Sequence, residues 1–418
     1  MVEHMNKVRI FTIIVAMVLF CAMFVQGTQA QTGRRYAEPV FDEVNVVTGI
    51  PYSSAIREGQ TSPTTLYLDF YEPEGDTFDA RPLVITVFGG AFVAGSRDFA
   101  DMQEYCTRLA KHGYAAASID YRLLSFFQIS RKALIRDAYM AAQDVSSAIR
   151  FFKAYSEEYR IDTSRIFLLG NSAGSIAILC ELFMGEDERP AETFENPDLG
   201  PMHSSGFDEY AGFSSAVAGA IPQWGGVMDL DVISMEEYKP LCMLHGTDDE
   251  NVPYDSGYCY SSYLSGVMPF MYGSHPIAGR LDEIGITDYE FHSFEGEGHA
   301  FYFVPVLYTL DEDKFDICFS IARDFLFGHL NYLASLSEWD EENIQVYPNP
   351  ATGMVTISVD GMVSDELSIV VMDVTGRKML EKKSSNPQVT IDVTQWPSGV
   401  YFVRIGCNGF CSSRKIVK

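Results

Sequence analysis

The sequence predicts an α/β fold, a three-layer sandwich around a mostly parallel sheet, followed by a small all-β sandwich at the C-terminal end. Two observations lead to this prediction. As far as about residue 336, apolar runs of strand length alternate with amphipathic helical stretches, a pattern typical of a sheet covered on both faces. From residue 344 onward, short alternating strands are separated by Gly and Pro turns, and no helical period remains.

The first thirty residues have the pattern of a secretory signal. Lys7 and Arg9 precede an apolar run over residues 10–25, and small residues follow at 27–30. That run is short for a membrane span, so we expect a signal peptide over 1–30 and no transmembrane span in the mature chain. The remainder is expected to divide into a catalytic domain, 31–340, and a β-sandwich domain, 341–418.

Composition excludes some partners. The chain has 418 residues, 47% of them hydrophobic, which is enough for two domains, and a formal net charge of −27. Nucleic acid and anionic membranes are therefore not expected to bind it. No Cys/His cluster has the spacing of a zinc site, so neither a metal nor an organic cofactor is expected. Cys407 and Cys411 could bridge a hairpin, since export permits disulfides.

The elements of the first domain follow in order. Residues 185–213 are acidic, proline-bearing and aperiodic, so they are interpreted as an excursion over the sheet, of which a small lid is one possible form. The expected strands are 65–71, 83–88, 115–119, 166–169, 217–227, 240–246 and 289–294, and the expected helices are 101–112, 132–159, 175–184 and 314–336. In the C-terminal domain the expected strands are 354–359, 367–374, 388–393 and 400–405.

A candidate nucleophile lies between a strand and a helix. The sequence Gly-Asn-Ser-Ala-Gly at 170–174 follows the buried strand 166–169 and precedes the helix that starts near 175. Strand, Gly-x-Ser-x-Gly and helix form the nucleophile-elbow pattern, in which glycines permit the sharp turn that exposes the serine. This predicts Ser172 as a nucleophile and directs the Ala173 N–H toward a developing oxyanion.

A serine nucleophile needs a base and an acid, which follow it in this order: serine, acid, histidine. The loop after strand 240–246 offers Asp248 or Asp249 as the acid, and the loop after strand 289–294 offers His299 as the base. All of these lie at the carboxyl ends of strands, on the same edge as Ser172. The Gly-Gly-Ala sequence at 89–91, after strand 83–88, would let backbone N–H groups face a ligand.

Over residues 60–335 the chain resembles the α/β-hydrolase esterases of the hormone-sensitive-lipase and carboxylesterase kind. The resemblance rests on the elbow, on Asp-Tyr-Arg at 120–122 and on the loops at 88–92, 245–253 and 298–299. It implies Asp249 rather than Asp248 as the acid, and Gly90, Ala91 and Ala173 as oxyanion donors. The family's usual oxyanion motif begins with histidine, whereas this chain has Phe88, with Ala91 in place of the last glycine.

The resemblance implies a secreted serine carboxylic-ester hydrolase acting on short acyl or aryl esters, such as acetyl or feruloyl groups of polysaccharides. Two alternatives stay open. One is a peptidase of the same fold, and the other is a surface-displayed binding protein with an inactive site. Hydrolysis of amides would favour the peptidase. Absence of any turnover in a folded protein would favour the binding protein.

The C-terminal unit resembles the sorting domain of the type IX (Por) secretion system of Gram-negative bacteria. Val-Tyr-Pro-Asn-Pro at 346–350, Gly-Val-Tyr at 399–401 and the basic end at 415–418 carry this resemblance. It implies the type IX machinery as a partner and a secreted or cell-surface location. A carbohydrate-binding β-sandwich is the alternative, although Trp396, Tyr401 and Phe402 fit turn or core positions better than a sugar platform.

Overall fold

A computed structural model describes residues 35–235, 238–260, 268–304, 309–334, 344–359, 367–373, 378–384, 386–407 and 410–418. The expected signal peptide and the boundary predicted at residue 340 lie outside these ranges. Within them, no helix combines the length and the apolar character that crossing a bilayer requires.

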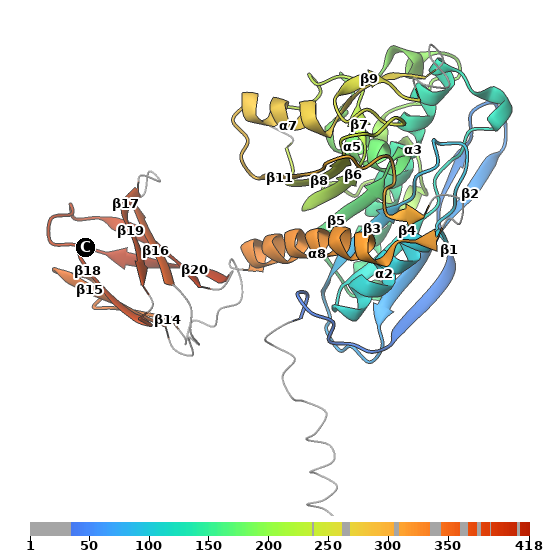
Figure 1. The fold of residues 1–418 in the computed structure, drawn as a ribbon. Coiled ribbons are helices and arrows are strands. Elements are labelled where there is room, and N and C mark those ends of the chain that lie inside the picture. Colours follow the sequence, from blue (N-terminus) through green and yellow to red (C-terminus); the bar gives the residue numbers. More distant parts are fainter. Residues whose placement is uncertain are drawn as a thin grey trace, which may run out of the picture.

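A large mixed sheet forms the centre of the first domain (Figure 1). The first two strand pairs along the sheet are antiparallel, and every later pair is parallel. The inner strands are buried along most of their length, which explains their continuous apolar sequences. In spatial order the strands are β1 (Val44–Ile56), β2 (Pro63–Pro73), β4 (Ala115–Ile119), β3 (Arg81–Val87), β5 (Ile161–Asn171), β6 (Gly219–Gln223), β8 (Leu241–Gly246) and β11 (Tyr289–Phe294).

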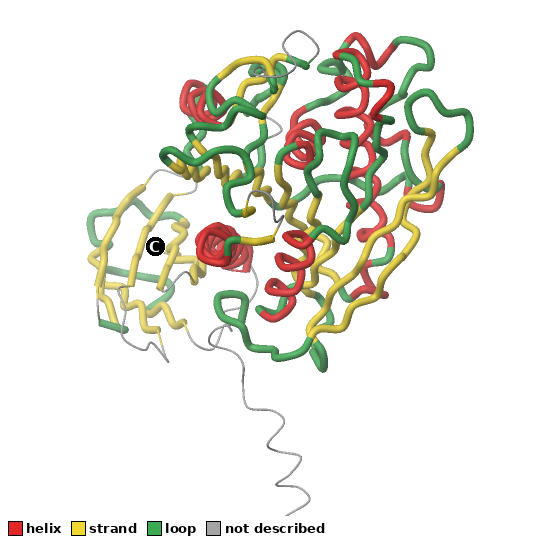
Figure 2. The backbone as a smooth tube through the Cα atoms, turned by 45° about the vertical axis from the view of Figure 1, so that its right-hand side comes forward, coloured by secondary structure: helices red, strands yellow, loops and turns green. Residues whose placement is uncertain are grey.

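Helices cover both faces of this sheet, α2 and α8 on one and α3 and α5 on the other (Figures 1 and 2). Arg108 of α2 forms ion pairs with Glu312 and Asp316 of α8, which fasten the two helices together. These layers confirm the predicted three-layer α/β fold. The helices are α2 (Ala100–Lys111), α3 (Arg131–Ala154), α4 (Ser156–Tyr159), α5 (Ala173–Phe183), α7 (Ser274–Glu283) and α8 (Glu312–Ala334).

Smaller elements decorate the large sheet. The stretch expected as one strand over 217–227 divides into β6 and β7, because Trp224 between them has a positive φ of 38°. The other short elements are the sheet β7 (Gly226–Val227), β10 (Phe270–Gly273) and β9 (Ser256–Tyr258), the pair β12 (Phe303–Val304) and β13 (Thr309–Leu310), and the 3₁₀ turns η1 (Phe126–Gln128), η2 (Ala191–Phe194), η3 (Met202–Ser204) and η4 (Asp208–Tyr210).

The irregular segment 185–213 lies along α3. Three buried α3 side chains, spaced seven residues apart on one face, donate hydrogen bonds to its carbonyls: Arg136 to Glu192 and Pro197, Gln143 to Leu199 and Pro201, and Arg150 to Ser205. Buried backbone carbonyl groups that lie outside helices and sheets need hydrogen-bond donors of this kind. Among the described residues, none of those that line the cavities beside Ser172 comes from this segment. It is therefore a fastened excursion rather than a lid over Ser172.

The C-terminal strands form two antiparallel sheets around their own apolar core, as predicted. This apolar cluster is separate from the core of the large domain. Figure 1 shows the C-terminal strands as a distinct group that follows α8 in the chain. The side chains of Cys407 and Cys411, expected as a possible disulfide, are outside the described part. The sheets are β14 (Ile344–Tyr347), β15 (Met354–Val359) and β18 (Gln388–Asp392), and β17 (Lys378–Ser384), β16 (Leu367–Asp373), β19 (Val400–Cys407) and β20 (Phe410–Val417).

Candidate active site

Ser172 occupies a sharp turn between β5 and α5. Its backbone has φ 51° and ψ −119°, a conformation that residues with a side chain rarely adopt. The turn also requires glycines on both sides. A Cβ on Gly170 would lie 2.7 Å from the Ile178 side chain, and one on Gly174 would lie 2.1 Å from the Val87 carbonyl oxygen. The predicted elbow is therefore present in the backbone, packed against the end of β3.

This packing predicts the effect of a single added methyl group. Replacing Gly174 with alanine is expected to lower the free energy of unfolding by about 3 kcal/mol, because the Val87 carbonyl belongs to a central strand and cannot withdraw cheaply. Urea denaturation of the full chain measures this change. Gly279, inside α7, is the matched control, since a Cβ there meets nothing within 4 Å. Gly279→Ala should stabilise by about 0.5–1 kcal/mol, and equal losses in both variants would contradict the prediction.

Three side chains from different strand ends form one hydrogen-bonded chain. His299 Nε2 lies 2.8 Å from Ser172 Oγ, and His299 Nδ1 lies 2.7 Å from Asp249 Oδ2. Ser172 follows β5, Asp249 follows β8 and His299 follows β11, so the parallel strands bring residues up to 127 positions apart to one edge. The structure thus brings together Ser172, Asp249 and His299, as the sequence predicts, whereas Asp248 takes no part in this chain.

The Asp249 carboxylate is buried and fully engaged. Its Oδ1 accepts hydrogen bonds from the backbone N–H groups of Asn251 (2.8 Å) and Val252 (2.9 Å). Burial would raise the pKa of Asp249, but hydrogen bonds and charge interactions with His245 and His299 outweigh it and lower the pKa to about 2. Asp249 is therefore ionised at neutral pH and accepts from His299 Nδ1–H, which leaves Nε2 free to accept the Ser172 hydroxyl proton.

A second histidine, His245, also contacts the carboxylate. Its Nε2 lies 3.2 Å from Asp249 Oδ2 and 3.1 Å from the Val252 carbonyl oxygen, while Nδ1 lies 2.9 Å from Ser274 Oγ. The Ser274 backbone N–H also approaches Nδ1, at 3.5 Å. Because this N–H can only donate, Nδ1 is the acceptor and Nε2 carries the proton shared by the carbonyl and the carboxylate. His245 thus has a structural role, which is to hold the acid loop.

The loop after β3 curls beside Ser172. Gly90 has φ 122° and Ala91 has φ 53°, and a Cβ on Gly90 would lie 2.0 Å from the Ala94 carbonyl oxygen. Among the described residues, no acceptor is assigned to the backbone N–H of Gly90, Ala91 or Ala173. These three groups are thus available to an incoming oxygen atom, which is the arrangement expected for oxyanion donors.

Phe88, which replaces the family's usual histidine, braces this loop by packing. Its ring stacks on Tyr121, with centroids 4.4 Å apart, and the Tyr121 hydroxyl donates a 3.0 Å hydrogen bond to the Phe88 carbonyl oxygen. Both side chains are buried. The loop therefore has a support that differs from the family's motif but leaves the backbone N–H groups unobstructed.

A buried polar cluster beside Ser172 was not predicted from the sequence. Asp101 Oδ2 accepts hydrogen bonds from Asn171 Nδ2 (2.5 Å) and the Tyr302 hydroxyl (3.0 Å), and Tyr302 also reaches Gln223 (3.3 Å). Burial raises the pKa of Asp101 to about 6, against the opposing effect of these hydrogen bonds. The one signal available was the position of Asp101 at the start of a helix that follows the Gly-rich loop.

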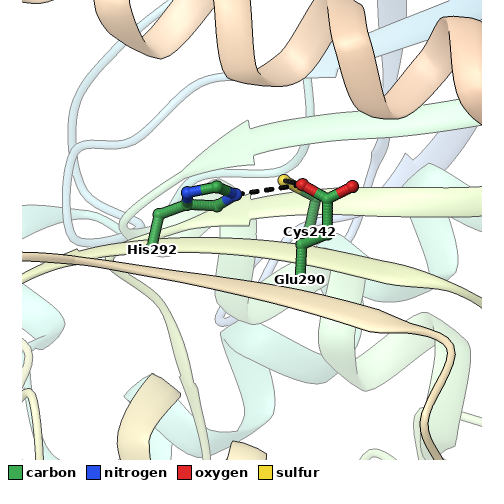
Figure 3. Close-up of side chains that lie close together, drawn as sticks. All are labelled: Cys242, Glu290 and His292. Carbon is green, nitrogen blue, oxygen red and sulfur yellow. Dashed lines mark hydrogen bonds and ion pairs between the residues drawn. The ribbon is translucent and has the colours of Figure 1, made fainter.

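The described residues contain one group that could offer three metal ligands, away from Ser172. Cys242 of β8 and Glu290 and His292 of β11 lie on adjacent strands with ligand atoms within 4.8 Å of one another (Figure 3). Glu290 and His292 already pair at 3.0 Å, and burial raises the pKa of the Cys242 thiol well above its usual value. Glu290 and His292 thus already serve as hydrogen-bond partners for each other, and no function is assigned to this group.

Comparison with known proteins gives two family matches. Residues 68–209 match the model of the BD-FAE family, and residues 345–418 match the secretion system C-terminal sorting domain. The fold and the first match define an α/β-hydrolase domain of the esterase type. The second identifies the C-terminal unit as a secretion sorting domain, which confirms that interpretation over a carbohydrate-binding sandwich.

Individual relatives are distant. A probable isoprenylcysteine alpha-carbonyl methylesterase of Arabidopsis thaliana is 25% identical over 47% of this chain and 44% of its own length. Its counterpart in Oryza sativa subsp. japonica is 34% identical over 28% of this chain and 24% of its own length. The chain thus spans less than half the length of these relatives. Esterase 2 of Thermogutta terrifontis, phosphorylated by paraoxon, is a similar solved structure (TM-score 0.46, 21% identity, covering 66% of this chain and 94% of that one).

Proposed function

We propose that the protein is an exported serine esterase that hydrolyses carboxylic esters. Ser172 is the nucleophile, His299 is the general base and then the general acid, and Asp249 fixes the imidazole tautomer. The observation that carries the proposal is the unbroken pair of hydrogen bonds from Ser172 Oγ through His299 to the ionised Asp249. The match of residues 68–209 to an esterase family supports the same reaction.

The geometry supports a two-step acyl transfer. Ser172 Oγ attacks the ester carbonyl carbon while its proton passes to His299 Nε2, and the backbone N–H groups of Gly90, Ala91 and Ala173 stabilise the oxyanion. When the carbonyl re-forms, the C–O bond to the alcohol breaks and the alcohol leaves with the proton from His299. Water then repeats the sequence on the acyl-serine and releases the carboxylic acid. No metal or organic cofactor is needed for any of these steps.

Substrate and destination complete the proposal. The substrates are short acyl or aryl esters, with acetyl and feruloyl groups of polysaccharides as the first candidates, supported by the family match and by the sorting domain. The sorting domain is proposed to engage the type IX secretion machinery. The mature protein is then released outside the cell or attached to its surface.

Covalent labelling tests the nucleophile directly. The chain without its signal peptide, residues 31–418, would be treated with paraoxon and examined by mass spectrometry. We expect one diethylphosphate adduct, on the peptide that contains Ser172, and a matching loss of p-nitrophenyl acetate hydrolysis. An adduct on another serine would contradict the assignment. Absence of any adduct, in a folded protein without turnover, would favour the binding-protein alternative, and turnover of a dipeptide amide alone would favour a peptidase.

A further inference from the structure

Two cavities of very different size meet at Ser172. The small cavity has a volume of about 30 Å³, and the large cavity has a volume of about 600 Å³. Ser172 and Tyr260 line both, so the two open toward the same hydroxyl group from different sides. The acyl chain and the alcohol part of an ester extend in different directions from the carbonyl carbon. Two cavities that meet at one nucleophile match this arrangement.

The walls of the small cavity are apolar and firmly packed. Leu134 and Ala138 come from α3, Ile176 comes from α5, and Met268 and Met271 close the opposite side. All five side chains are buried in the main core. Such walls widen only if neighbouring core residues move, because protein interiors are close-packed. The small cavity has about one twentieth of the volume of the large cavity, so it accepts a much smaller group.

The large cavity has mixed walls. Phe99, Trp224 and Phe303 contribute aromatic rings, while Asp101 and Asn251 contribute polar groups. This combination suits a ligand with an apolar face and hydroxyl groups at its edge, such as a sugar ring.

The position of His299 decides which part of the ester enters which cavity. His299 must give its proton to the leaving alcohol oxygen, so the alcohol lies on the side where the imidazole is exposed. His299 is among the residues that line the large cavity and is not among those that line the small one. Of the three proposed oxyanion donors, Ala91 and Ala173 line the small cavity and Gly90 lines the large one, so the carbonyl oxygen would be held where the two cavities meet. The acyl chain, which lies opposite the leaving group, therefore points into the small cavity.

We infer that the small cavity is the acyl site and the large cavity the alcohol site, so that the enzyme prefers acetyl, and at most propionyl, esters of bulky alcohols. This inference rests on the proposed function and narrows it. Of the two candidate acyl groups, acetyl places one methyl carbon beyond the carbonyl, which the space admits. A feruloyl group would have to place an aromatic ring there, so feruloyl esters are expected to be poor acyl donors.

An acyl-length series tests the assignment. The chain without its signal peptide would be assayed on p-nitrophenyl acetate, propionate, butyrate, hexanoate and ferulate. We expect kcat/KM to fall about 10-fold or more for each methylene beyond propionate, since a missing or extra methylene in a tight pocket changes discrimination by that amount. Ferulate should be turned over at least about 100-fold more slowly than acetate.

Two variants enlarge the small cavity to different degrees. Ile176→Val removes one methylene and Met271→Ala removes most of a side chain, so the milder variant remains informative if the larger change impairs folding. Both should shift the preferred chain toward butyrate. Phe303→Ala, in the large cavity, is the control. It should leave the order of acyl preference intact and change the ratio of p-nitrophenyl acetate to ethyl acetate turnover.

The outcomes separate the two proposals. If ferulate or hexanoate were turned over as fast as acetate while paraoxon still labelled Ser172, the cavity assignment would be wrong. The proposed esterase function would not be affected by that result. A shift in acyl preference caused by Phe303→Ala rather than by Ile176→Val would overturn the cavity assignment as well. No ester turnover and no label on Ser172 would instead remove the proposed function itself.

Discussion

Replacing Ser172 with alanine is expected to lower kcat for ester hydrolysis by about a million-fold, which leaves only the contribution of the oxyanion donors and binding. The loss should be this large because the remaining groups act through the serine oxygen. His299 Nε2 would have no hydroxyl proton to accept, because the Ser172 Oγ that lies 2.8 Å away would be absent. Stopped assays with p-nitrophenyl acetate at high enzyme concentration would measure the residual rate.

Ser146 provides a matched control for this substitution. It is a buried serine on α3, and its hydroxyl has no hydrogen-bond partner among the described residues. Ser146→Ala should therefore keep kcat unchanged while it removes the same atom from another buried serine. Rapid turnover that survives in Ser172→Ala would show that another group is the nucleophile.

Replacing Asp249 with asparagine is expected to lower kcat by about 10⁴-fold with little change in shape. The carboxylate accepts Nδ1–H of His299 at 2.7 Å, and its low pKa keeps it ionised. An amide in the same place can present its NH₂ to Nδ1, which would move the imidazole proton to Nε2 and leave Ser172 without a base. Steady-state kinetics should show the loss in kcat more than in KM, because the acid does not contact the substrate.

The neighbouring Asp248 makes this prediction specific. The sequence alone offers either aspartate, and the two differ by one position on the same loop. The exposed Asp248 carboxylate accepts a long hydrogen bond, 3.4 Å, from the hydroxyl of Thr247. This hydrogen bond does not involve His299. Asp248→Asn should therefore change kcat by no more than a few-fold. A larger loss in Asp248→Asn than in Asp249→Asn would contradict the proposed acid.

The three-layer fold could be predicted because it follows from local sequence patterns. The edge of the sheet that holds the candidate site could be predicted for the same reason. Continuous apolar runs mark buried parallel strands, and the carboxyl ends of such strands share one edge. Ser172 and Asp249 each follow one of these runs, and His299 follows the alternating strand β11 at the edge of the same sheet, so their meeting required no knowledge of loop conformation. Their catalytic roles stay proposals until the substitutions above are measured.

Several strands at the edges of their sheets were not predicted. β17 (Lys378–Ser384) lies at the edge of its sheet and carries three lysines and a glutamate, which is suitable for an edge but gives no hydrophobic signal. β1 (Val44–Ile56) is likewise an edge strand with mostly exposed side chains in its first half. Edge positions relax the alternation on which strand prediction depends.

Contacts between distant segments were the other limit. Asp101 and Tyr302 are 201 residues apart and meet only because α2 and the loop after β11 pack against the same end of the sheet. Neither residue belongs to a motif with fixed spacing. The size of the small cavity depends in the same way on the packing of α3, α5 and the 268–271 stretch, so acyl preference could not be predicted from sequence.

The backbone at Ser172 has a consequence for the balance between stability and chemistry. A serine held at φ 51° and ψ −119° makes the folded state less stable by about 1–3 kcal/mol than an unstrained turn would. Glycine adopts a positive φ without steric cost and would relieve much of this strain. Ser172→Gly is therefore expected to stabilise the fold while it removes the proposed nucleophile, so stability and the proposed hydrolysis oppose each other at this residue.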